Sequence, residues 1–432
     1  MRVTFYTLGC KVNQNETGAL AQLFEENGYT VVSNEESADV YIVNSCTVTN
    51  FGDQKSRKWL RRAKRENPGA VTVLTGCYPQ AFPDEAAEIA EADVVTGSGN
   101  RHAILADVQK VLNGEEERVV DIHPHEKGER FEELPMDKFA EHTRAFVKVE
   151  DGCNRRCAYC VIPRARGPVR SRDEASVLEE LRRLAEAGYK EVVLTAISLP
   201  SYGTDSGTSL VELIEKAAEV PGIERIRLGS LDPDMLHDED IRRMAAVKKL
   251  CPQFHLSLQS GCDKTLRAMR RPYTTAQYAD IAAKLRAAFG AENVSFTTDV
   301  IVGFPGETEE DFEASMDFVT GMQFLKVHVF PYSRREGTAA YDFPGQVQEH
   351  EKESRSRRMT AAVEEVRAAE VAAMRGRTAS VLLETPLSAT MFTGYTKQYL
   401  PVLVSASGHK TGDIVDVTLG EWDGKRCRAT VL

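Results

Sequence analysis

Residues 145–160 have the sequence AFVKVEDGCNRRCAYC. The apolar, β-branched run at 145–149 predicts a strand, and Cys153, Cys157 and Cys160 follow it with C-x3-C-x2-C spacing. Thiolates are the usual ligands of iron–sulfur clusters. A structural zinc site normally needs four ligands, and no fourth Cys or His lies close in the sequence. Three such cysteines can hold three irons of a four-iron cube and leave the fourth iron open to a non-protein ligand.

Further strand and helix patterns alternate beyond this stretch. Strands are expected at 191–195, 225–228, 254–258, 296–302 and 325–330, with helices that include 173–187, 209–219, 275–289 and 309–320. Together with 145–149 this gives six strand–helix units, which predict a partial (β/α)6 barrel. Functional groups are then expected on the loops that follow the strands.

The amino-terminal part also alternates strands with helices. Expected strands at 3–8, 39–44 and 71–75 precede expected helices at 17–27, 53–66 and 83–91. This alternation predicts a parallel α/β sheet with helices on its faces. Cys10, Cys46 and Cys77 each follow one of the three strands. Because ligands bind outside the carboxyl ends of parallel strands, these three cysteines are expected to converge on one point.

The sequence predicts four segments, which are 1–112, a charged linker at 113–138, the barrel at 139–370 and a terminal domain at 371–432. A polar, alanine-rich helix is expected near 348–374. The short β-branched runs after it predict a small β-barrel of the oligonucleotide-binding (OB-like) kind. A purely structural cap is the alternative. Tyr395 and Tyr399 in this domain are equally compatible with stacking on RNA bases and with core packing.

The charge distribution is uneven. The net charge is −11, yet residues 55–65 carry seven basic side chains and no acidic one, and residues 155–172 carry six basic side chains and no acidic one. An acidic protein with two basic stretches can bind a polyanion locally. The alternative for residues 55–65 is an ordinary solvated helix face.

Length and composition exclude several classes of protein. No apolar run reaches the roughly 18 residues that a membrane helix needs, and the first residues do not resemble a signal peptide. Nine cysteines without a secretory signal favour metal ligation or catalysis over disulfides. A cytoplasmic protein with no membrane partner is expected. Cys251, Cys262 and Cys427 match no ligand spacing and are expected to be structural thiols.

The C-x3-C-x2-C motif with Tyr159 before its last cysteine resembles the radical S-adenosylmethionine (SAM) superfamily. Further motifs resemble the methylthiotransferases of that superfamily: TLGCKVNQNET at 7–17, NSCTVT at 44–49, TGCYPQ at 75–80, SLQSGCDKTLRAMRRPYT at 257–274, TTDVIVGFPGET at 297–308 and HVFPYSRREGT at 328–338. The terminal domain resembles TRAM, their RNA-binding barrel. The TLGCKVNQ opening is most similar to the MtaB-type branch, which acts on N6-threonylcarbamoyladenosine in tRNA.

The resemblance implies two 4Fe-4S clusters and SAM as both methyl donor and radical source. Cys153, Cys157 and Cys160 would hold the radical-generating cluster. Cys10, Cys46 and Cys77 would hold an auxiliary cluster whose open iron carries sulfur. In the family, one SAM methylates that sulfur, and a second supplies the radical that leads to replacement of hydrogen by methylthio at carbon 2 of the adenine.

The resemblance also implies cofactor contacts, and it assigns no catalytic residue beyond the cluster ligands. Tyr159 would lie near the adenine of SAM. Gln259 and Asp299 are candidates for contacting SAM or substrate, with a structural hydrogen bond at the barrel rim as the equal alternative. Ala196 stands where the family often has a glycine, which leaves open the backbone contacts to the cofactor at that loop.

The function implied is a tRNA methylthiotransferase that converts N6-threonylcarbamoyladenosine at position 37, beside the anticodon, to its 2-methylthio derivative. The alternatives are a methylthiotransferase acting on a ribosomal-protein aspartate and a non-catalytic, metal-containing RNA-binding protein. The implied partners are the anticodon stem-loop of tRNA and an electron donor such as flavodoxin or ferredoxin. The sulfur donor is left open, and a monomer is expected.

Overall fold

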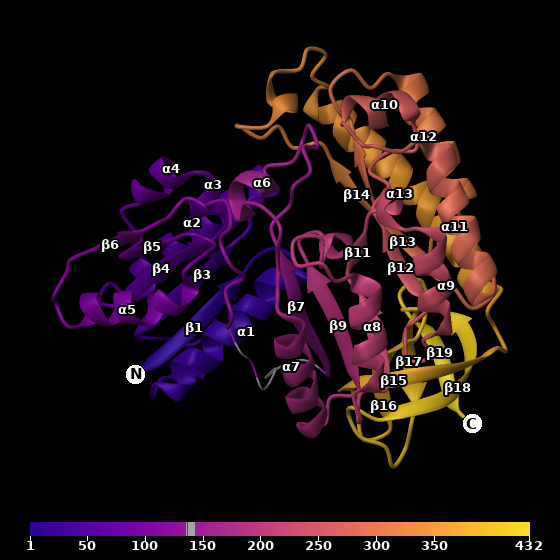
Figure 1. The fold of residues 1–432 in the computed structure, drawn as a ribbon, viewed down its shortest axis with the longest axis horizontal. Coiled ribbons are helices and arrows are strands. Elements are labelled where there is room, and N and C mark those ends of the chain that lie inside the picture. The colour runs from indigo at the N-terminus through magenta and orange to yellow at the C-terminus, as the bar shows by residue number, and fades with distance from the viewer. Residues whose placement is uncertain (135, 137–142) are drawn as a thin grey trace.

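The computed structural model describes residues 1–134, 136 and 143–432. It consists of an amino-terminal parallel sheet, a central partial barrel and a small carboxy-terminal β-barrel, as the sequence predicted (Figure 1). The predicted linker–barrel boundary at 138/139 falls outside the described residues.

The amino-terminal sheet has six parallel strands in the order β2-β1-β3-β4-β5-β6. These are β1 (Arg2–Thr7), β2 (Thr30–Val32), β3 (Val40–Ser45), β4 (Val71–Gly76), β5 (Val94–Thr96) and β6 (Val119–Asp121). The sequence predicted β1, β3 and β4. The other strands have only three residues each, too few for a periodic signal. β6 lies within the predicted linker, so that part of the linker prediction was wrong.

Helices cover this sheet, and the first of them begins earlier than expected. They are α1 (Lys11–Glu26), α2 (Asn50–Glu66), α3 (Cys77–Ala81), α4 (Pro83–Ala87) and α5 (Ile104–Leu112), with a 3-10 turn, η1 (Arg101–Ala103). The first turns of α1 bury Asn13, Asn15 and Glu16. These polar side chains concealed the helical pattern before residue 17, because a buried face normally shows as an apolar stripe.

The central barrel consists of two four-stranded sheets, β10-β9-β7-β8 and β11-β12-β13-β14. Its strands are β7 (Arg144–Asp151), β8 (Arg170–Ser171), β9 (Glu191–Ala196), β10 (Arg225–Leu228), β11 (Ser230–Leu231), β12 (Gln253–Leu256), β13 (Ser295–Val302) and β14 (Lys326–Pro331). All six predicted strands are present, and a bridge between Ile226 and Leu250 connects the two halves. The partial barrel is therefore confirmed.

The barrel helices and 3-10 turns are α6 (Ile162–Arg166), α7 (Glu174–Glu186), η2 (Leu199–Ser201), α8 (Leu210–Glu219), η3 (Pro233–Met235), α9 (Asp238–Ala246), α10 (Asp263–Ala268), α11 (Thr275–Phe289), α12 (Glu309–Gly321), η4 (Ala339–Asp342) and α13 (Glu349–Ala372). Side chains of the strands and of these helices form one large apolar core. None of the helices in the described residues has the length and apolar character needed to cross a membrane.

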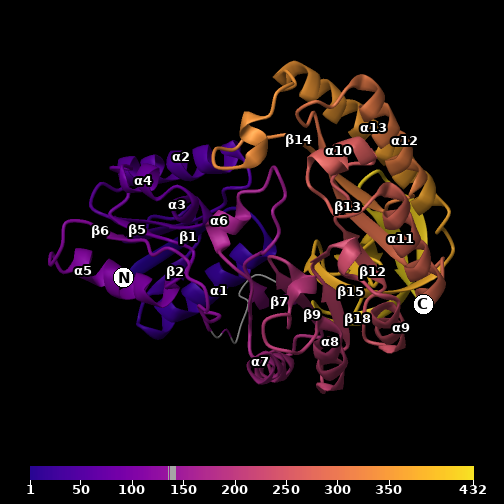
Figure 2. The same cartoon turned by 45° about the horizontal axis from the view of Figure 1, so that its top comes forward.

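The amino-terminal domain contacts the barrel through α1, through α3, which packs against α6, and through α2. On one side α1 packs against β7, where the Asn15 side-chain amide donates to the Phe146 carbonyl at 2.6 Å. On the other side the loop after β14 reaches α2 (Figure 2), and Arg335 on this loop pairs with Asp53 at 2.7 Å. Contacts from both halves of the barrel thus hold the sheet.

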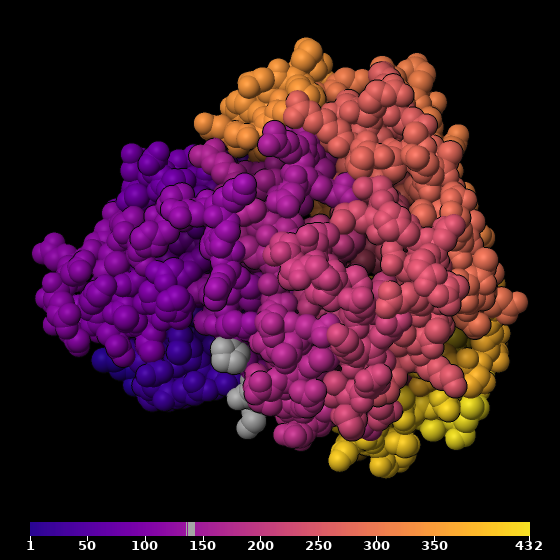
Figure 3. Space-filling view, in the orientation of Figure 1, coloured from indigo at the N-terminus to yellow at the C-terminus, as the bar shows by residue number. Residues whose placement is uncertain are grey.

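The carboxy-terminal β-barrel is closed, with strand order β15-β16-β17-β19-β18. Its strands are β15 (Thr378–Pro386), β16 (Met391–Thr396), β17 (Pro401–Ser405), β18 (Ile414–Trp422) and β19 (Cys427–Val431). It packs against the central barrel, on the opposite side of the molecule from the amino-terminal sheet (Figure 3).

The contact between the two barrels is built from arginines and tyrosines. The rings of Tyr395 and Tyr399 stack on each other with centroids 4.6 Å apart, and Arg144 at the start of β7 lies over both rings. Buried Arg225 and Arg227 donate to backbone carbonyls of the carboxy-terminal β-barrel. Tyr395 and Tyr399 therefore pack at a domain interface, which favours the packing role over stacking on RNA bases.

The two basic stretches differ in exposure. On α2 the basic side chains Lys58, Arg61, Arg62 and Arg65 are exposed. In the second stretch Arg166, Arg170 and Arg172 are buried in ion pairs. The expectation of a second exposed basic stripe at 155–172 was therefore wrong for half of its charges, because buried carboxylates neutralise them.

Candidate functional site

Three adjacent strands of the amino-terminal sheet end beside one another in a cysteine. Thr7 of β1 pairs with Asn44 of β3, and Ser45 of β3 pairs with Gly76 of β4. Cys10, Cys46 and Cys77, hereafter the amino-terminal triad, follow these pairs at the carboxyl edge of the sheet. The structure therefore brings the three predicted residues to one edge.

Glycine at position 9 permits the close approach within this triad. Gly9 has a φ of 106°, and a Cβ there would lie 2.9 Å from the Cβ and 3.1 Å from the Sγ of Cys46. Any larger residue would displace Cys46 and strain the backbone. The loop that holds Cys10 can therefore lie directly against Cys46.

The second set, Cys153, Cys157 and Cys160, is hereafter the barrel triad. It lies on the loop after β7, where the Cys153 amide donates to the Gly167 carbonyl at 3.0 Å and the Cys160 amide to the Cys157 carbonyl at 3.1 Å. Gly152 has a φ of 93°, and a Cβ there would lie 1.9 Å from the Pro168 carbonyl oxygen. The loop is therefore fixed at both sides of the first cysteine.

Burial keeps several of these thiols protonated. It raises the pKa of Cys46 and Cys160 to about 12 and that of Cys153 to about 11. Metal ligation requires thiolates, so binding a metal releases these protons. Among the described residues, no three Cys, His, Asp or Glu side chains gather closely enough to hold a single metal ion. A four-iron cube does not need that spacing, because each thiolate binds a different iron.

A buried ionic network lies between the two triads. Arg166 on α6 donates from Nε to the Sγ of Cys77 at 3.1 Å and from Nη1 to Glu16 of α1 at 2.5 Å. Its Nη1 also donates to Asp151, at the end of β7, at 3.3 Å. Lys148 bonds to both Glu16 and Asp151, at 2.7 and 2.6 Å. The network therefore connects the amino-terminal sheet to the strand that precedes the barrel triad.

The carboxylates of this network are held ionised. Burial alone would raise the pKa of Glu16, but Arg101, Arg166 and Lys148 lower it to about 2. The pKa of Asp151 is likewise lowered, by Lys148, Arg166 and Arg170, against the effect of burial. In contrast, burial raises the pKa of Glu150 well above its usual value, although it accepts a hydrogen bond from the Ser198 amide at 2.8 Å.

Replacing Glu16 by glutamine is expected to destabilise the contact between α1 and β7 by about 3–5 kcal/mol, because it leaves buried cations without their partner. Hydrogen exchange of the α1 and β7 amides measures the free energy of local opening. Glu25 is exposed on the same helix and gives the control variant Glu25→Gln. This control should change the free energy of local opening by less than about 0.5 kcal/mol. Equal protection in both variants would contradict this role of Glu16.

The same contact should respond to acid in a defined direction. The pKa of Glu16 is about 2 in the folded chain and about 4.3 when unfolded. The contribution of ionised Glu16 to the stability of the α1–β7 contact is therefore complete above pH ~4.3 and is lost as the pH falls toward 2. Protection of α1 amides should fall over this range in the wild-type chain, and Glu16→Gln should reduce that dependence.

The other predicted contact residues lie around the barrel. Tyr159 is half-buried and packs with Ala158, Met269 and Phe304. The Gln259 amide donates to the Asp299 carbonyl at 2.9 Å, and Gln259 has a φ of 71°, a conformation that costs energy for a non-glycine residue. The Asp299 carboxylate lies 3.3 Å from Nε2 of His255. Gln259 and Asp299 are thus adjacent.

Sequence reasoning missed Glu16 as a buried ligand of arginines, and it missed Arg166 and Arg271 as donors to cysteine sulfur. Arg271 donates from Nη1 to the Sγ of Cys157 at 3.2 Å. Both arginines occur in sequences rich in arginine, so nothing in the local pattern separates them from exposed neighbours. The available signal was the polar start of α1, which is unusual for a helix against a sheet.

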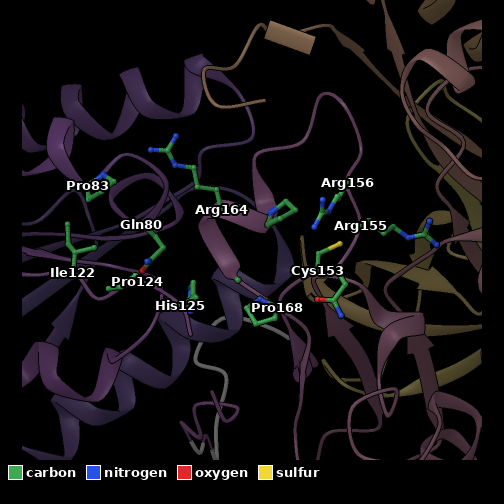
Figure 4. Close-up of a pocket in the computed structure, with 13 residues that line it drawn as sticks. Gln80, Pro83, Ile122, Pro124, His125, Cys153, Arg155, Arg156, Arg164 and Pro168 are labelled. Carbon is green, nitrogen blue, oxygen red and sulfur yellow. The ribbon is translucent and has the colours of Figure 1, made fainter. Parts of the chain in front are cut away.

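A cavity of about 730 Å³ opens beside Cys153, between the amino-terminal sheet and the barrel. Gln80, Pro83 and Ile122 line one side, and Cys153 lies on the other with Arg155 and Arg156 (Figure 4). Arg156 and Arg164 are exposed, whereas Arg155 pairs with Asp232 and Asp234. The cavity offers positive charge next to the barrel triad.

Two family models match this chain. The Radical SAM superfamily matches residues 147–319, and the model described as uncharacterized protein family UPF0004 matches residues 2–97. A Bacillus subtilis protein named threonylcarbamoyladenosine tRNA methylthiotransferase MtaB is 39% identical over 423 residues, which are 96% of this chain and 93% of that protein. The chain belongs to the tRNA methylthiotransferase family.

Other relatives of this methylthiotransferase carry two names. A Thermotoga maritima protein, 35% identical over 100% of this chain and 98% of its own, is also named threonylcarbamoyladenosine tRNA methylthiotransferase MtaB. An Akkermansia muciniphila protein, 33% identical over 97% of this chain and 96% of its own, is named tRNA-2-methylthio-N(6)-dimethylallyladenosine synthase. The family inferred from the sequence is confirmed.

A solved structure shows the same fold for most of this methylthiotransferase. The radical S-adenosylmethionine methyltransferase TsrM from Kitasatospora setae superimposes with a TM-score of 0.57 over 78% of this chain and 73% of its own, at 15% identity. At that identity the match supports the arrangement of sheet and barrel.

Proposed function

We propose that this methylthiotransferase converts N6-threonylcarbamoyladenosine at position 37 of tRNA to its 2-methylthio derivative. The observation that carries the proposal is the combination of two separate cysteine triads, at two strand-end sites, with 35–41% identity to three relatives named for this substrate. One triad alone would suffice for a radical SAM enzyme, so the amino-terminal triad calls for a second role.

The donor chemistry of both triads fits four-iron clusters. We infer that Cys153, Cys157 and Cys160 hold one cluster and that Cys10, Cys46 and Cys77 hold the other. Bound SAM and the two clusters would supply the radical, the methyl group and the sulfur. Hydrogen bonds from Arg166 and Arg271 to cysteine sulfur suit anionic, thiolate-ligated groups.

The remaining side chains would bind and orient substrate and cofactor. The cavity beside Cys153 places Arg156 and Arg164 where phosphates of the anticodon stem-loop could bind. Tyr159, Gln259 and Asp299 remain candidates for contacting SAM or the modified base. An electron donor such as flavodoxin or ferredoxin, a monomeric state and a cytoplasmic location stay part of the proposal, as do the predicted domain bounds apart from the part of the linker that forms β6.

Mass spectrometry of tRNA nucleosides tests the substrate. A strain that lacks this protein should lose the 2-methylthio derivative of N6-threonylcarbamoyladenosine and accumulate its precursor. The gene should restore the product, and a variant with all six triad cysteines changed to alanine should not. Loss of the 2-methylthio derivative of N6-dimethylallyladenosine instead would overturn the substrate, as would loss of methylthio-aspartate from a ribosomal protein.

The exposed basic face of α2 should contribute to tRNA binding. Changing Lys58, Arg61, Arg62 and Arg65 to alanine is expected to weaken binding at moderate salt and to flatten its salt dependence. Each lost phosphate contact reduces the slope by about 0.9 by analogy with DNA. Arg61 pairs with Glu91, and Arg62 and Arg65 pair with Glu66, so their contribution is expected to be smaller than that of Lys58.

Binding titrations at several salt concentrations measure this effect. Arg182 and Arg242, exposed on the barrel helices α7 and α9, provide a control in which both become alanine. Wild-type affinity and slope in the α2 variant would show that this face is an ordinary solvated surface and would leave the cavity beside Cys153 as the RNA site.

A further inference from the structure

We propose that Arg166 is a positioning residue for the amino-terminal triad, supplied across the domain interface by the barrel. The inference rests on the proposed function, because it takes Cys10, Cys46 and Cys77 as cluster ligands. Arg166 lies on α6, just beyond the barrel triad, and is fully buried. Its Nε nevertheless lies 3.1 Å from the Sγ of Cys77 in the other domain.

The orientation of the guanidinium is fixed by its other partners. Nη1 and Nη2 donate to the two carboxylate oxygens of Glu16, at 2.5 and 3.0 Å. Nη2 also donates to the Asn13 side-chain oxygen at 2.7 Å. Because the guanidinium is planar and its donors have a fixed geometry, this two-pronged contact leaves the Nε hydrogen directed at Cys77. The donor is therefore in place before any ligand binds.

The guanidinium of Arg166 brings a lasting positive charge to Cys77. Four buried cations of the network, Arg101, Lys148, Arg166 and Arg170, face the buried carboxylates Glu16 and Asp151 and the partly exposed Glu132 and Glu129 at its edge. Arginine keeps its proton in proteins. Arg166 therefore favours a thiolate over a neutral thiol at Cys77.

Arg166 also connects the two triads. Its Nη1 donates to Asp151 at 3.3 Å, and the other oxygen of Asp151 accepts the Gly152 amide at 2.9 Å. Gly152 directly precedes Cys153 of the barrel triad. One side chain therefore touches a ligand of one proposed cluster and the carboxylate that supports the loop of the other.

The barrel triad has a corresponding arginine of its own. Arg271 donates to Cys157 at 3.2 Å and to the hydroxyl of Tyr273 at 3.0 Å, and it pairs with Asp232. Each triad thus has one cysteine that accepts a hydrogen bond from a buried guanidinium. Since Arg271 and Cys157 belong to the same domain, Arg271 serves as an internal comparison for the contact that crosses the interface.

Redox potentiometry tests the proposal on full-length protein reconstituted anaerobically with iron and sulfide. The background carries Cys153, Cys157 and Cys160 as alanine, so that only the amino-terminal cluster contributes to the electron paramagnetic resonance signal. In this background Arg166→Gln should shift the reduction potential to more negative values, because a donor and a positive charge that stabilise the reduced cluster are removed. Arg166→Lys keeps the charge and should give an intermediate value.

Two further variants separate this effect from general destabilisation. Arg172, buried against Glu180 without a cysteine contact, gives Arg172→Gln, which should leave the potential unchanged. Arg271→Gln should also leave it unchanged, since its sulfur partner is absent. A wild-type potential in both Arg166 variants would overturn the proposal. Absence of iron from the background chain with Arg166 intact would instead overturn the amino-terminal cluster itself, and so the proposed function.

Discussion

Changing Cys153, Cys157 and Cys160 together to alanine is expected to abolish the reductive cleavage of SAM and to halve the bound iron, from about eight to about four per chain if each triad holds a four-iron cluster. Without the barrel triad no cluster remains on the loop after β7, where a radical SAM domain needs it. Detection of 5′-deoxyadenosine after chemical reduction measures the loss of SAM cleavage. Iron and sulfide assays measure the loss of bound iron.

Cysteines outside the triads provide the control for this variant. Cys262 is half-buried at the start of α10 and Cys427 is buried in the carboxy-terminal β-barrel. The double variant Cys262→Ala and Cys427→Ala should keep all its iron and its cleavage activity. If the triple variant also keeps all its iron, the assignment of the barrel triad is wrong. Zinc without sulfide in the wild-type chain would favour a non-catalytic RNA-binding protein.

Changing Cys10, Cys46 and Cys77 together to alanine should abolish methylthio insertion and leave SAM cleavage measurable. The two triads lie on separate elements, so removing the amino-terminal thiols leaves the three cysteines of the barrel triad available. The measurement compares 5′-deoxyadenosine with the methylthiolated nucleoside in the same reaction. Complete loss of SAM cleavage in a folded variant would show that the two sites do not act separately.

The contact between Arg166 and Cys77 predicts that two single variants of the amino-terminal triad differ in SAM cleavage. Because Arg166 binds Cys77 together with Glu16 and Asp151, the loss of Cys77 alone should disturb the loop of the barrel triad more than the loss of Cys10. Cys10 is exposed and lies at the start of α1. Single variants at these two positions should therefore differ in their rate of SAM cleavage, with Cys77→Ala the slower.

The features that sequence predicts well are those encoded over long, regular segments. The six barrel strands and helices such as α11 follow apolar periodicity, and α11 occurs at Thr275–Phe289 as predicted. The two triads were found from spacing and from their position after strands. In both cases the signal is local, since each cysteine needs only its own strand to be recognised.

The features that sequence does not predict depend on pairs of residues far apart in the chain. Glu16 and Arg166 lie 2.5 Å apart across two domains, and neither position indicates this partner. Arg166 and the exposed Arg164 occur in the same short helix. Burial, which decides whether a charge binds RNA or neutralises a carboxylate, is a property of the assembled interface.

The interface of Tyr395 and Tyr399 with the central barrel limits which domains can be exchanged between members of this family. The base of the central barrel presents Arg144, Arg225 and Arg227, which contact tyrosine rings, backbone carbonyls and the Ser380 hydroxyl of the carboxy-terminal β-barrel. A chimera that takes its carboxy-terminal β-barrel from a distant relative would leave these cations against an unmatched surface. A functional chimera should therefore take the five strands of the carboxy-terminal β-barrel from the same parent as the first residue of β7 and the arginines of β10.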